Sequence, residues 1–353
     1  MKNKGYMKIV VPIVSLLLAF LIGSLAIISV GQNPIVAYSY LFTGALGNIG
    51  SLGETLVKAT PLIFTGLAAT FAYRCNLFNL GAEGQFIMGS IGSVWFAIKF
   101  GNSLPPFISI LVSLLIGAIC GGLWGFIPGL LKSFLSLNEM IITILLNYIA
   151  TLFMSYLFSG PLMEANIPQT AAVAESLKLP KFLPGTRVHI GIFIAIILAA
   201  ILYYFLFNTT AGFKLRAVGL NQEASLVNGF NVKKYMFFSF IISGAIAGLG
   251  GAIELHGAQF RLMAGYGEEF GFDGVAIALI GQLNPIGTVI VAFLFAILRT
   301  GANTMQIATG IPTTVVGIIQ ALVIIFVVAG TTLVNQGSIS SFLKNRKRGE
   351  AKC

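Results

Sequence analysis

The chain has 353 residues, of which 57% are hydrophobic and only 9% are charged, and its mean hydropathy is +0.93. These values lie far from those of soluble domains and predict an all-α polytopic membrane protein. The formal net charge of +10 is spread over short loops and both ends of the chain, which argues against a nucleic-acid-binding protein and instead indicates topology signals.

The first predicted membrane span follows a basic N-terminus. Lys2, Lys4 and Lys8 precede an apolar run at residues 9–30 that is long enough to cross a bilayer. This run is longer than the apolar region of a secretory signal peptide, and no small-residue cleavage pattern closes it. We therefore expect a retained helix, with residues 1–8 in the cytoplasm.

Nine further apolar segments are predicted to cross the membrane, which makes about ten crossings. They are residues 52–73, 82–99, 105–131, 139–159, 188–208, 236–256, 271–284, 286–301 and 312–333. Eight or nine full crossings are the alternative, because the eighth and ninth segments are short and broken around Asn284 and Pro285. With both termini in the cytoplasm, most of the 21 Lys and Arg residues fall inside, including those of a basic tail at 334–353. Residues 1–353 are expected to form a single transmembrane domain.

Two connections are longer than a helix hairpin requires. Residues 160–187 are predicted outside the membrane, either as a docking surface for a substrate-delivering protein or as a linker. Residues 209–235 are predicted inside and contain a short helix, for which Asn221 fits the N-cap, Glu223 the first turn and Gly229 the C-cap. So short a helix is unstable alone in water. It is held either by its own bundle or by a partner that moves the membrane domain.

A short motif of glycine, any residue, an acid and glycine occurs twice. The first copy spans residues 81–84 and the second spans residues 271–274, and each copy opens an apolar segment. In the ten-crossing arrangement the copies begin on opposite sides of the membrane, as two halves of inverted topology require. Such halves are typical of alternating-access transporters, whose substrate path lies between them.

Polar side chains in or beside the apolar segments are candidates for a translocation path, because an amide or a charge inside the bilayer needs a partner or a cavity. These candidates are Asn76, Asn79, Glu83, Gln85, Asn138, Glu139, Asn147, Asp273, Gln282 and Asn284. For Glu83 and Asp273 the alternative is a carboxylate that caps the start of a helix. For Asn147, which lies deepest in a predicted span, the alternative is a contact with a neighbouring helix.

The sequence contains no catalytic or metal-binding pattern. It has no Walker A loop, no paired-histidine zinc motif and no nucleophile elbow. Cys75, Cys120 and Cys353 are odd in number and too far apart for metal-ligand spacing. We therefore expect a chain that is not an enzyme and has no metal or cofactor of its own, so that any dependence on ATP comes from another chain.

Four ordered segments give the chain a resemblance to a known family. They are CNLFNLGAEGQ at 75–85, NEMIITILLNY at 138–148, RAVGLNQEAS at 216–225 and GFDGVAIALIGQLNPIG at 271–287. These segments resemble the permeases of ATP-binding-cassette (ABC) importers of the branched-chain amino acid and ribose class. Within that class they are most similar to the bacterial nucleoside and simple-sugar permeases that are linked to basic membrane proteins. The resemblance covers nearly the whole chain.

The resemblance implies a permease of the bacterial cytoplasmic membrane that imports guanosine-like purine or pyrimidine nucleosides by alternating access. The implied partners, besides membrane lipid, are an ABC ATPase that binds ATP, a second permease chain, usually a distinct paralogue, and an extracytoplasmic substrate-binding lipoprotein or protein. The loop at 209–235 then corresponds to the coupling loop that meets the ATPase. Its coupling residues are Arg216, Gly219, Asn221, Glu223, Ala224 and Gly229. The alternatives are a ribose or simple-sugar permease and an ion-coupled secondary transporter that uses buried carboxylates such as Glu139 or Glu254.

Overall fold

The structure, a computed structural model, describes residues 2–335, and almost all of its regular structure is α-helical. Seven of the described helices are long and apolar enough to cross a membrane. These segments are Val10–Ser29, Ile49–Arg74, Pro106–Leu135, Glu139–Ser159, Gly191–Asn208, Val232–Gln259 and Pro285–Thr309. The prediction of an all-α polytopic membrane protein is confirmed. The predicted basic tail lies outside the described residues from position 336 onward.

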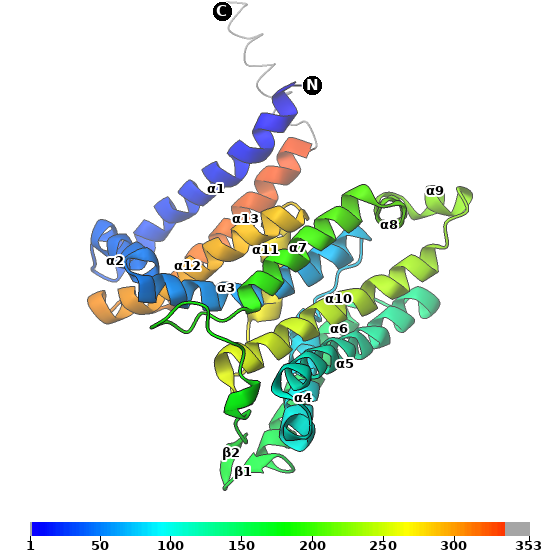
Figure 1. The fold of residues 1–353 in the computed structure, drawn as a ribbon. Helices are drawn as coiled ribbons and strands as arrows, with labels where there is room; N and C mark the ends of the chain where they lie inside the picture. Colours follow the sequence, from blue (N-terminus) through cyan, green and yellow to red (C-terminus); the bar gives the residue numbers. More distant parts are fainter. Residues whose placement is uncertain (1, 336–353) are drawn as a thin grey trace, which may run out of the picture. The chain divides into compact units, whose positions relative to one another are not determined.

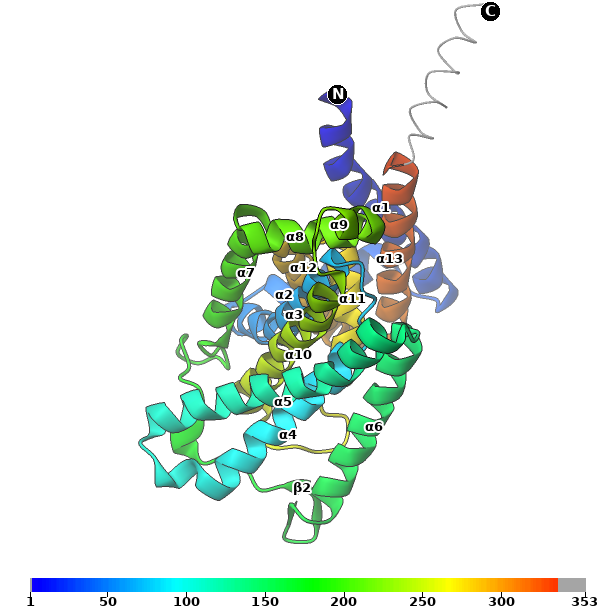
Figure 2. The ribbon, with the colours of Figure 1, turned by 90° about the vertical axis from the view of Figure 1, so that its right-hand side faces the viewer.

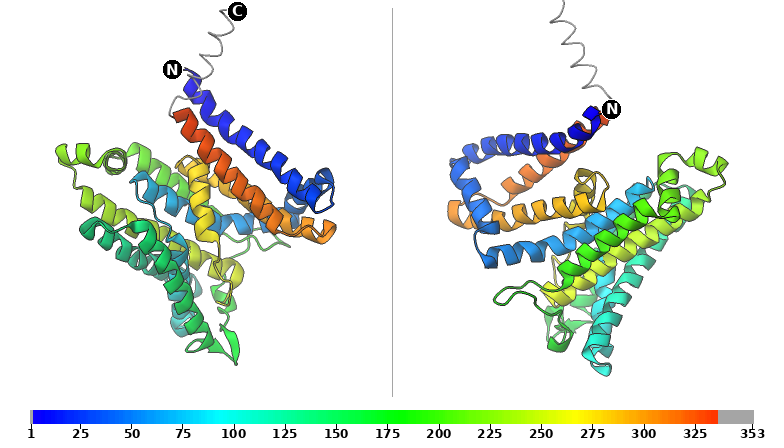
Figure 3. Two further views of the ribbon diagram at one scale, coloured as in Figure 1. Left: turned by 180° about the vertical axis from the view of Figure 1, so that it is seen from behind. Right: turned by 45° about the horizontal axis from the view of Figure 1, so that its top comes forward.

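The chain forms two compact units, and the boundary between them falls within α12 (Pro285–Thr309). The first unit contains α1 (Lys2–Ser29), α2 (Pro34–Leu46), the later part of α12 and α13 (Thr314–Asn335). Helices α1 and α13 lie side by side (Figure 3), and Ser15 Oγ donates a hydrogen bond of 3.0 Å to Phe326 O. The second unit, Ile49–Ala296, contains every predicted site residue.

Helix α2 has no counterpart among the predicted segments, because its 13 residues are too few to cross a bilayer. Its N-terminus carries a standard N-cap. The Asn33 side chain accepts a hydrogen bond of 2.9 Å from Ile35 N, and Pro34 occupies the first helical position. A search for helix-start signals, rather than for long apolar runs, would have located it.

The second unit is a helical bundle with two distinct ends. Its elements are α3 (Ile49–Arg74), α4 (Ala82–Phe100), the 3₁₀ turn η1 (Gly101–Ser103), α5 (Pro106–Leu135), α6 (Glu139–Ser159), β1 (Met163–Glu164), β2 (Ile167–Thr170), the 3₁₀ turn η2 (Glu175–Leu177), α7 (Gly191–Asn208), α8 (Thr210–Leu220), α9 (Gln222–Val227), α10 (Val232–Glu254) with the π-helical turn Leu255–Gln259, α11 (Phe270–Ile280) and the first part of α12. Helices α8 and α9 lie at one end, and β1 and β2 lie at the other (Figures 1 and 2). The two long connections therefore lie at opposite ends of the bundle.

Helices α4, α5 and α10 pack closely against one another, and Figure 2 shows α4 and α5 side by side. Gly121 of α5 faces Gly244 and Gly248 of α10, and Gly89 of α4 faces Gly248. A Cβ atom at any of these glycines would overlap backbone atoms of the neighbouring helix. Small residues allow membrane helices to approach this closely, which increases van der Waals contact. The glycines in these apolar runs therefore serve packing.

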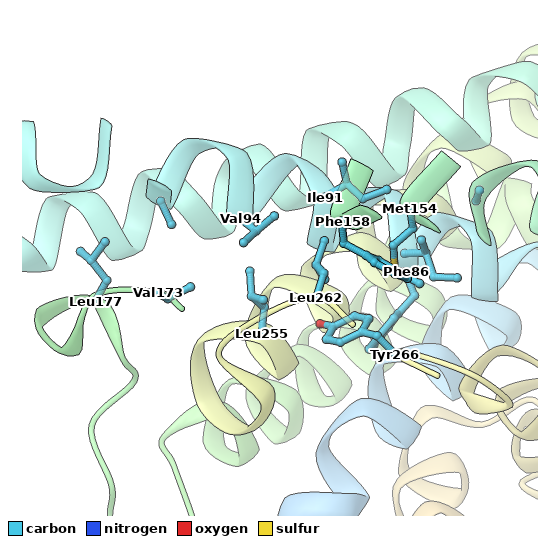
Figure 4. Close-up of a cluster of buried hydrophobic side chains, with 13 residues drawn as sticks. Phe86, Ile91, Val94, Met154, Phe158, Val173, Leu177, Leu255, Leu262 and Tyr266 are labelled. Atoms are coloured by element: carbon cyan, nitrogen blue, oxygen red, sulfur yellow. The ribbon is translucent and has the colours of Figure 1, made fainter. Parts of the chain in front are cut away.

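The segment between α6 and α7 is ordered and packs on the end of the bundle. Strands β1 and β2 form an antiparallel pair, and Val173 and Leu177 insert into a buried apolar cluster with residues of α4 and α6 (Figure 4). The His256 ring in the π-helical turn lies with Nδ1 2.8 Å from Leu177 O, and Leu179 N donates to His256 O at 2.8 Å. This end of the bundle therefore carries a fixed surface.

Candidate translocation site

Helix α4 begins inside the bundle rather than at its surface. Gly84 N donates a hydrogen bond of 2.8 Å to Asn147 Oδ1, and Asn147 Nδ2 donates one of 2.9 Å to Leu80 O. At about 1.5 Å per residue, Asn147 lies about 12 Å along α6 from Glu139, the first residue of that helix. Residues 75–81 therefore enter the bundle without forming a helix, and α4 starts near mid-depth.

A buried amide network holds this re-entrant segment. Asn79 Nδ2 lies 2.9 Å from Ser243 Oγ of α10 and 3.0 Å from Gln85 Oε1, and Asn79 Oδ1 accepts a hydrogen bond of 3.0 Å from Gly81 N. Ser243 Oγ in turn donates to Ala68 O at 2.7 Å. Asn79, Gln85 and Ser243 are almost wholly buried. Because their polar groups have partners within the chain, they position the backbone.

The two copies of the glycine-acid-glycine motif lie against each other. Gly271 packs directly on the backbone of Glu83, leaving no space for a Cβ atom. The Glu83 carboxylate is partly buried beside the backbone of Glu269 and Gly271, at the start of α11, and its Oε2 atom has no hydrogen-bond partner among the described residues. Glu83 lies in the first turn of α4, and its carboxylate also lies beside the start of α11 of the other copy. Asp273 lies in the first turn of α11.

Helix α11 is too short to cross a bilayer. It has 11 residues, about 16 Å at the helical rise, and the predicted span 271–284 is wrong in its length. The helix ends at Ile280, and Gln282 and Leu283 follow with φ of 56°. Arg74, the last residue of α3, donates a hydrogen bond of 2.7 Å to Leu283 O. Helix α11 therefore runs from mid-depth to the bundle end that holds α8 and α9.

The junction of α4 and α11 brings together two helix N-termini and two acidic side chains within the bundle. Helix N-termini carry partial positive charge, which Glu83 and Asp273 in the first turns complement. Broken helices that place such termini near the bilayer midplane form the substrate sites of many transporters. Of the predicted path residues, Asn79, Glu83, Gln85, Asn147 and Asp273 lie in α4 or α11 or contact one of these helices.

The other predicted path residues lie at helix ends and turns. Asn138 caps α6 and accepts from Met140 N at 3.0 Å, and Asn284 accepts from Ile286 N at 3.0 Å at the start of α12. Glu139 forms an ion pair of 2.6 Å with Lys132. Asn76 and Gln282 adopt positive φ in the turns that follow α3 and α11. Each therefore has a local role in a helix connection.

The predicted coupling loop consists of two helices. Asn221 separates α8 from α9 and caps α9, since its side chain accepts a hydrogen bond of 2.9 Å from Ala224 N. The predicted C-cap at Gly229 is displaced by one residue: Asn228 is the C-cap, and Gly229 follows with φ of 76°. Gly229 therefore supplies the left-handed turn that ends the helix. Glu223 lies in the first turn of α9, as predicted.

Helix α8 contacts the end of α3 and so lies beside the re-entrant segment. Gly219 packs against the carbonyl of Arg74 and the backbone of Cys75, and a Cβ atom there would overlap both. The guanidinium groups of Arg74 and Arg216 lie 5.1 and 5.0 Å from the centre of the Phe207 ring. In the sequence, Arg74 is marked only as one of the basic residues predicted on the cytoplasmic side. Its role here depends on Leu283, a partner that is distant along the chain.

The outer face of α8 and α9 is apolar and unusually exposed. Leu220 is 88% exposed, and Val227 is 89% exposed. A groove of about 430 Å³ runs along the two helices, lined in part by Arg216, Ala224 and Asn228. Exposed large apolar side chains at the rim of a polar surface are typical of a protein interaction site. Among the described residues, no group of three or more His, Cys, Asp or Glu side chains is placed to hold a metal ion.

The chain is similar over most of its length to known membrane permeases. Residues 51–328 match the family described as branched-chain amino acid transport system / permease component. The guanosine ABC transporter permease protein NupP of Bacillus subtilis is 38% identical over 325 residues, covering 90% of this chain and 92% of the relative. The nucleoside ABC transporter permease protein NupB of Lactococcus lactis is 35% identical over 99% of both chains. The glucose ABC transporter permease protein TsgB13 of Haloferax volcanii is 33% identical, covering 90% of this chain and 86% of the relative. No solved structure matches the chain.

Proposed function

Because this chain belongs to the family of permease components of branched-chain amino acid transport systems, we propose that it is the membrane-spanning permease of an ABC importer that carries nucleosides. As a permease component it is not an enzyme. The observation that carries a transport role is the junction of α4 and α11, where two helices begin within the bundle. The nucleoside class is supported by the guanosine and nucleoside permeases to which the chain is similar.

We further propose ten crossings in two inverted halves, with both termini in the cytoplasm of a bacterial cell. The directions of the two re-entrant segments support this topology. Residues 75–81 follow α3 at the end that holds α8 and α9. Residues 260–269 enter from the other end, where Thr170 N of β2 donates a hydrogen bond of 2.9 Å to Leu262 O. Segments that enter from opposite sides are what an inverted repeat requires.

A labelling experiment tests the topology. Val227 of α9 and Phe182 of the segment before α7 are both exposed and lie in opposite connections. Single cysteines at these positions would be treated in intact cells with a membrane-impermeant maleimide. Phe182→Cys should react and Val227→Cys should react only after the cells are opened. The reverse pattern would invert the proposed orientation.

The proposed translocation path passes the α4–α11 junction. Glu83 and Asp273 would face the path there and interact with the polar groups of the substrate, because a nucleoside carries hydroxyls that donate hydrogen bonds. Asn79, Gln85 and Asn147 would hold the junction in place. The residues at the helix connections, Asn76, Asn138, Glu139, Gln282 and Asn284, would line the inner mouth of the path.

In this proposal, the movement driven by the ATPase is transmitted to the α4–α11 junction through α8. An ABC ATPase would bind the exposed face of α8 and α9, through Arg216, Gly219, Asn221, Glu223, Ala224 and Gly229 or the backbone that they shape. A displacement of α8 would act on Arg74 and Cys75, since Gly219 packs on both. Arg74 begins the connection to α4 and holds Leu283, just beyond α11. One movement would therefore shift both α4 and α11 and open the path alternately to either side.

The remaining partners belong to the same proposal. A second permease chain, a paralogue of this one, would complete the pore. An extracytoplasmic substrate-binding lipoprotein or protein would deliver the nucleoside to the surface at residues 160–187, whose ordered packing on α4 and α10 is suited to a docking site. ATP would be bound by the ATPase, and the permease itself would hold no cofactor.

Uptake measurements test the function. Cells with and without this chain would be given labelled guanosine, adenosine, uridine, ribose and glucose, and the experiment would be repeated after removal of the neighbouring ATPase. Loss of nucleoside uptake in both deletions is the expected result. Loss of sugar uptake alone would favour the sugar alternative, which the similarity to the glucose permease motivates. Uptake that persists without the ATPase would instead indicate an ion-coupled carrier.

A further inference from the structure

A groove unrelated to the proposed path opens at the membrane boundary of the second unit. It has a volume of about 370 Å³ and lies between α7, α8 and α10, with Phe71 of α3 among its lining residues. The candidate span of α7 ends at Asn208 and that of α10 begins at Val232, so the mouth of the groove lies at the level of the headgroups. Tyr235 lines the same region, as aromatic residues commonly do at this interface.

Two cations line the mouth of the groove. Lys214 of α8 and Lys234 of α10 both contribute to its lining and are exposed. Neither forms an ion pair with any carboxylate among the residues that the structure describes. Lys214 Nζ lies 5.7 Å from the centre of the Phe230 ring, which orients the ammonium group toward the groove. The mouth is therefore positively charged, and no carboxylate within residues 2–335 forms an ion pair with either lysine.

The walls below the lysines are apolar and open to the bilayer. Phe238 is 46% exposed and Ile242 is 37% exposed, and both line the groove on α10. Along α10, Ile242 lies about 12 Å from Lys234, on the side of the hydrocarbon core. Phe205 of α7 forms the opposite wall. A positive mouth above an apolar channel matches a molecule with an anionic head and a hydrocarbon chain.

We propose that this groove binds an anionic phospholipid, with its phosphodiester at Lys214 and Lys234 and the first part of one acyl chain along Phe238 and Ile242. Basic clusters next to membrane spans attract anionic headgroups, whereas a zwitterionic lipid brings no net charge to the site. The bound lipid would join α8 to α10 and so stabilise the base of the predicted coupling helices. This site goes beyond the proposed function, because it does not depend on which substrate the protein carries.

Native mass spectrometry of the full-length chain tests the proposal. Dioleoyl-phosphatidylglycerol and dioleoyl-phosphatidylcholine, which have the same acyl chains, would be added separately at equal concentrations. Phosphatidylglycerol should bind at least about tenfold more tightly, since each lysine near an anionic surface contributes about a fivefold gain. Lys214→Gln and Lys234→Gln should each lower its affinity about fivefold. Equal binding of the two lipids by the unmodified chain would overturn the proposal.

The matched control is Lys233→Gln. Lys233 is exposed, precedes Lys234 on α10 and has the same charge, but does not line the groove. Its substitution should change the affinity less than about twofold. An equal loss in Lys233→Gln and Lys234→Gln would indicate diffuse surface charge and overturn the site.

Two further measurements identify the ligand and show whether the groove is open to lipid in the assembled complex. Millimolar inorganic phosphate should fail to displace the phospholipid, because phosphate cannot use the apolar walls; displacement would indicate a site for free anions instead. Phosphatidylglycerol should also remain bound to the complex purified with its ATPase and second permease. Loss of binding in that complex would show that a protein partner occupies the groove.

Discussion

Gly219 of α8 packs against the carbonyl oxygen of Arg74, at the point where α3 ends and the re-entrant segment begins. The contact leaves no room for a side chain, so α8 and α3 must move together at this point. Arg74 is in turn hydrogen-bonded to Leu283, which follows α11. Helix α8 therefore contacts the connection to α4 directly and reaches the end of α11 through Arg74.

Gly219→Val should reduce uptake at least tenfold while leaving membrane insertion intact. A Cβ atom at this position would push α8 away from Arg74. The measurement is nucleoside uptake at matched expression in the membrane fraction. Gly317→Val is the control, because Gly317 lies in α13 with no atom within 4 Å of the added Cβ. Normal uptake by Gly219→Val would contradict coupling through this contact.

Reversal of the charge at Glu223 should abolish uptake without affecting insertion, if α9 meets the ATPase as proposed. Glu223 is exposed in the first turn of α9, so its substitution should not disturb the packing of the bundle. Glu223→Lys would be compared with Glu175→Lys, an exposed carboxylate in the connection at the opposite end. Co-purification of the ATPase should weaken only for Glu223→Lys. Undiminished uptake and co-purification would remove α9 from the interface.

Asn147→Leu should destabilise the protein and lower uptake. The leucine would leave Gly84 N and Leu80 O without their hydrogen bonds inside the bundle, at a cost of about 1–3 kcal/mol for each buried group. The melting temperature in detergent and the uptake rate would both be measured. Thr151→Val, a near-isosteric loss of polarity on the same helix, is the control and should change the two quantities little. An unchanged melting temperature would contradict the positioning role of Asn147.

Gly121→Ala should destabilise the bundle by about 1–3 kcal/mol, whereas Gly122→Ala should be tolerated. An added methyl at Gly121 would overlap the carbonyl of Gly244, but at Gly122 the nearest atom is 3.3 Å away. The two adjacent variants carry the same chemical change, so differences in their melting temperatures report local packing alone. Equal melting temperatures would show that α5 and α10 can move apart without lowering the stability of the bundle.

Acidification should destabilise the segment before α7 through His189. Burial, with a smaller effect from the charge of Arg187, lowers the pKa of His189 to about 4. Between the unfolded value of about 6.5 and the folded value, only the unfolded chain binds a proton, so stability falls as the pH falls, by about 2 kcal/mol at pH 5. The His189→Gln variant lacks the titratable imidazole. Its melting temperature should therefore fall less between pH 7.5 and pH 5, and an equal fall in both proteins would exclude His189 as a cause.

The long apolar helices and the helix caps are predictable from the sequence because their signals are local. Residues 82–99 coincide almost fully with α4, and the cap at Asn221 is visible as an amide followed by an acid. The shortness of α11 is partly predictable, because the predicted segment is already short and broken around Asn284 and Pro285. Its end at Ile280 is not predictable in this way, since it depends on the positive φ of Gln282 and Leu283, which are not residues that normally mark a turn.

The sequence predicts which residues belong to the candidate site better than it predicts how those residues are arranged. The sequence reveals that Asn79, Glu83 and Asn147 are polar residues in apolar surroundings, but their partners are distant along the chain. Asn79 bonds to Ser243, and a single serine in an apolar helix carries no signal of its own. Gly271 contacts Glu83 only because the bundle brings the two motif copies together. Local patterns therefore predict candidate residues, whereas the tertiary fold decides which of them meet.

The contact of Gly89, Gly121 and Gly248 also limits where the protein can bend. With these backbones touching, a rotation of α10 relative to α5 or α4 would drive main-chain atoms into one another. The three helices must therefore move as one rigid body, because a close-packed interior transmits a displacement from one helix to the next. The non-helical stretches at 75–81 and 260–269 lie outside this group of three helices. A spectroscopic distance label on α5 and α10 should stay constant through the transport cycle, whereas one across either stretch should change.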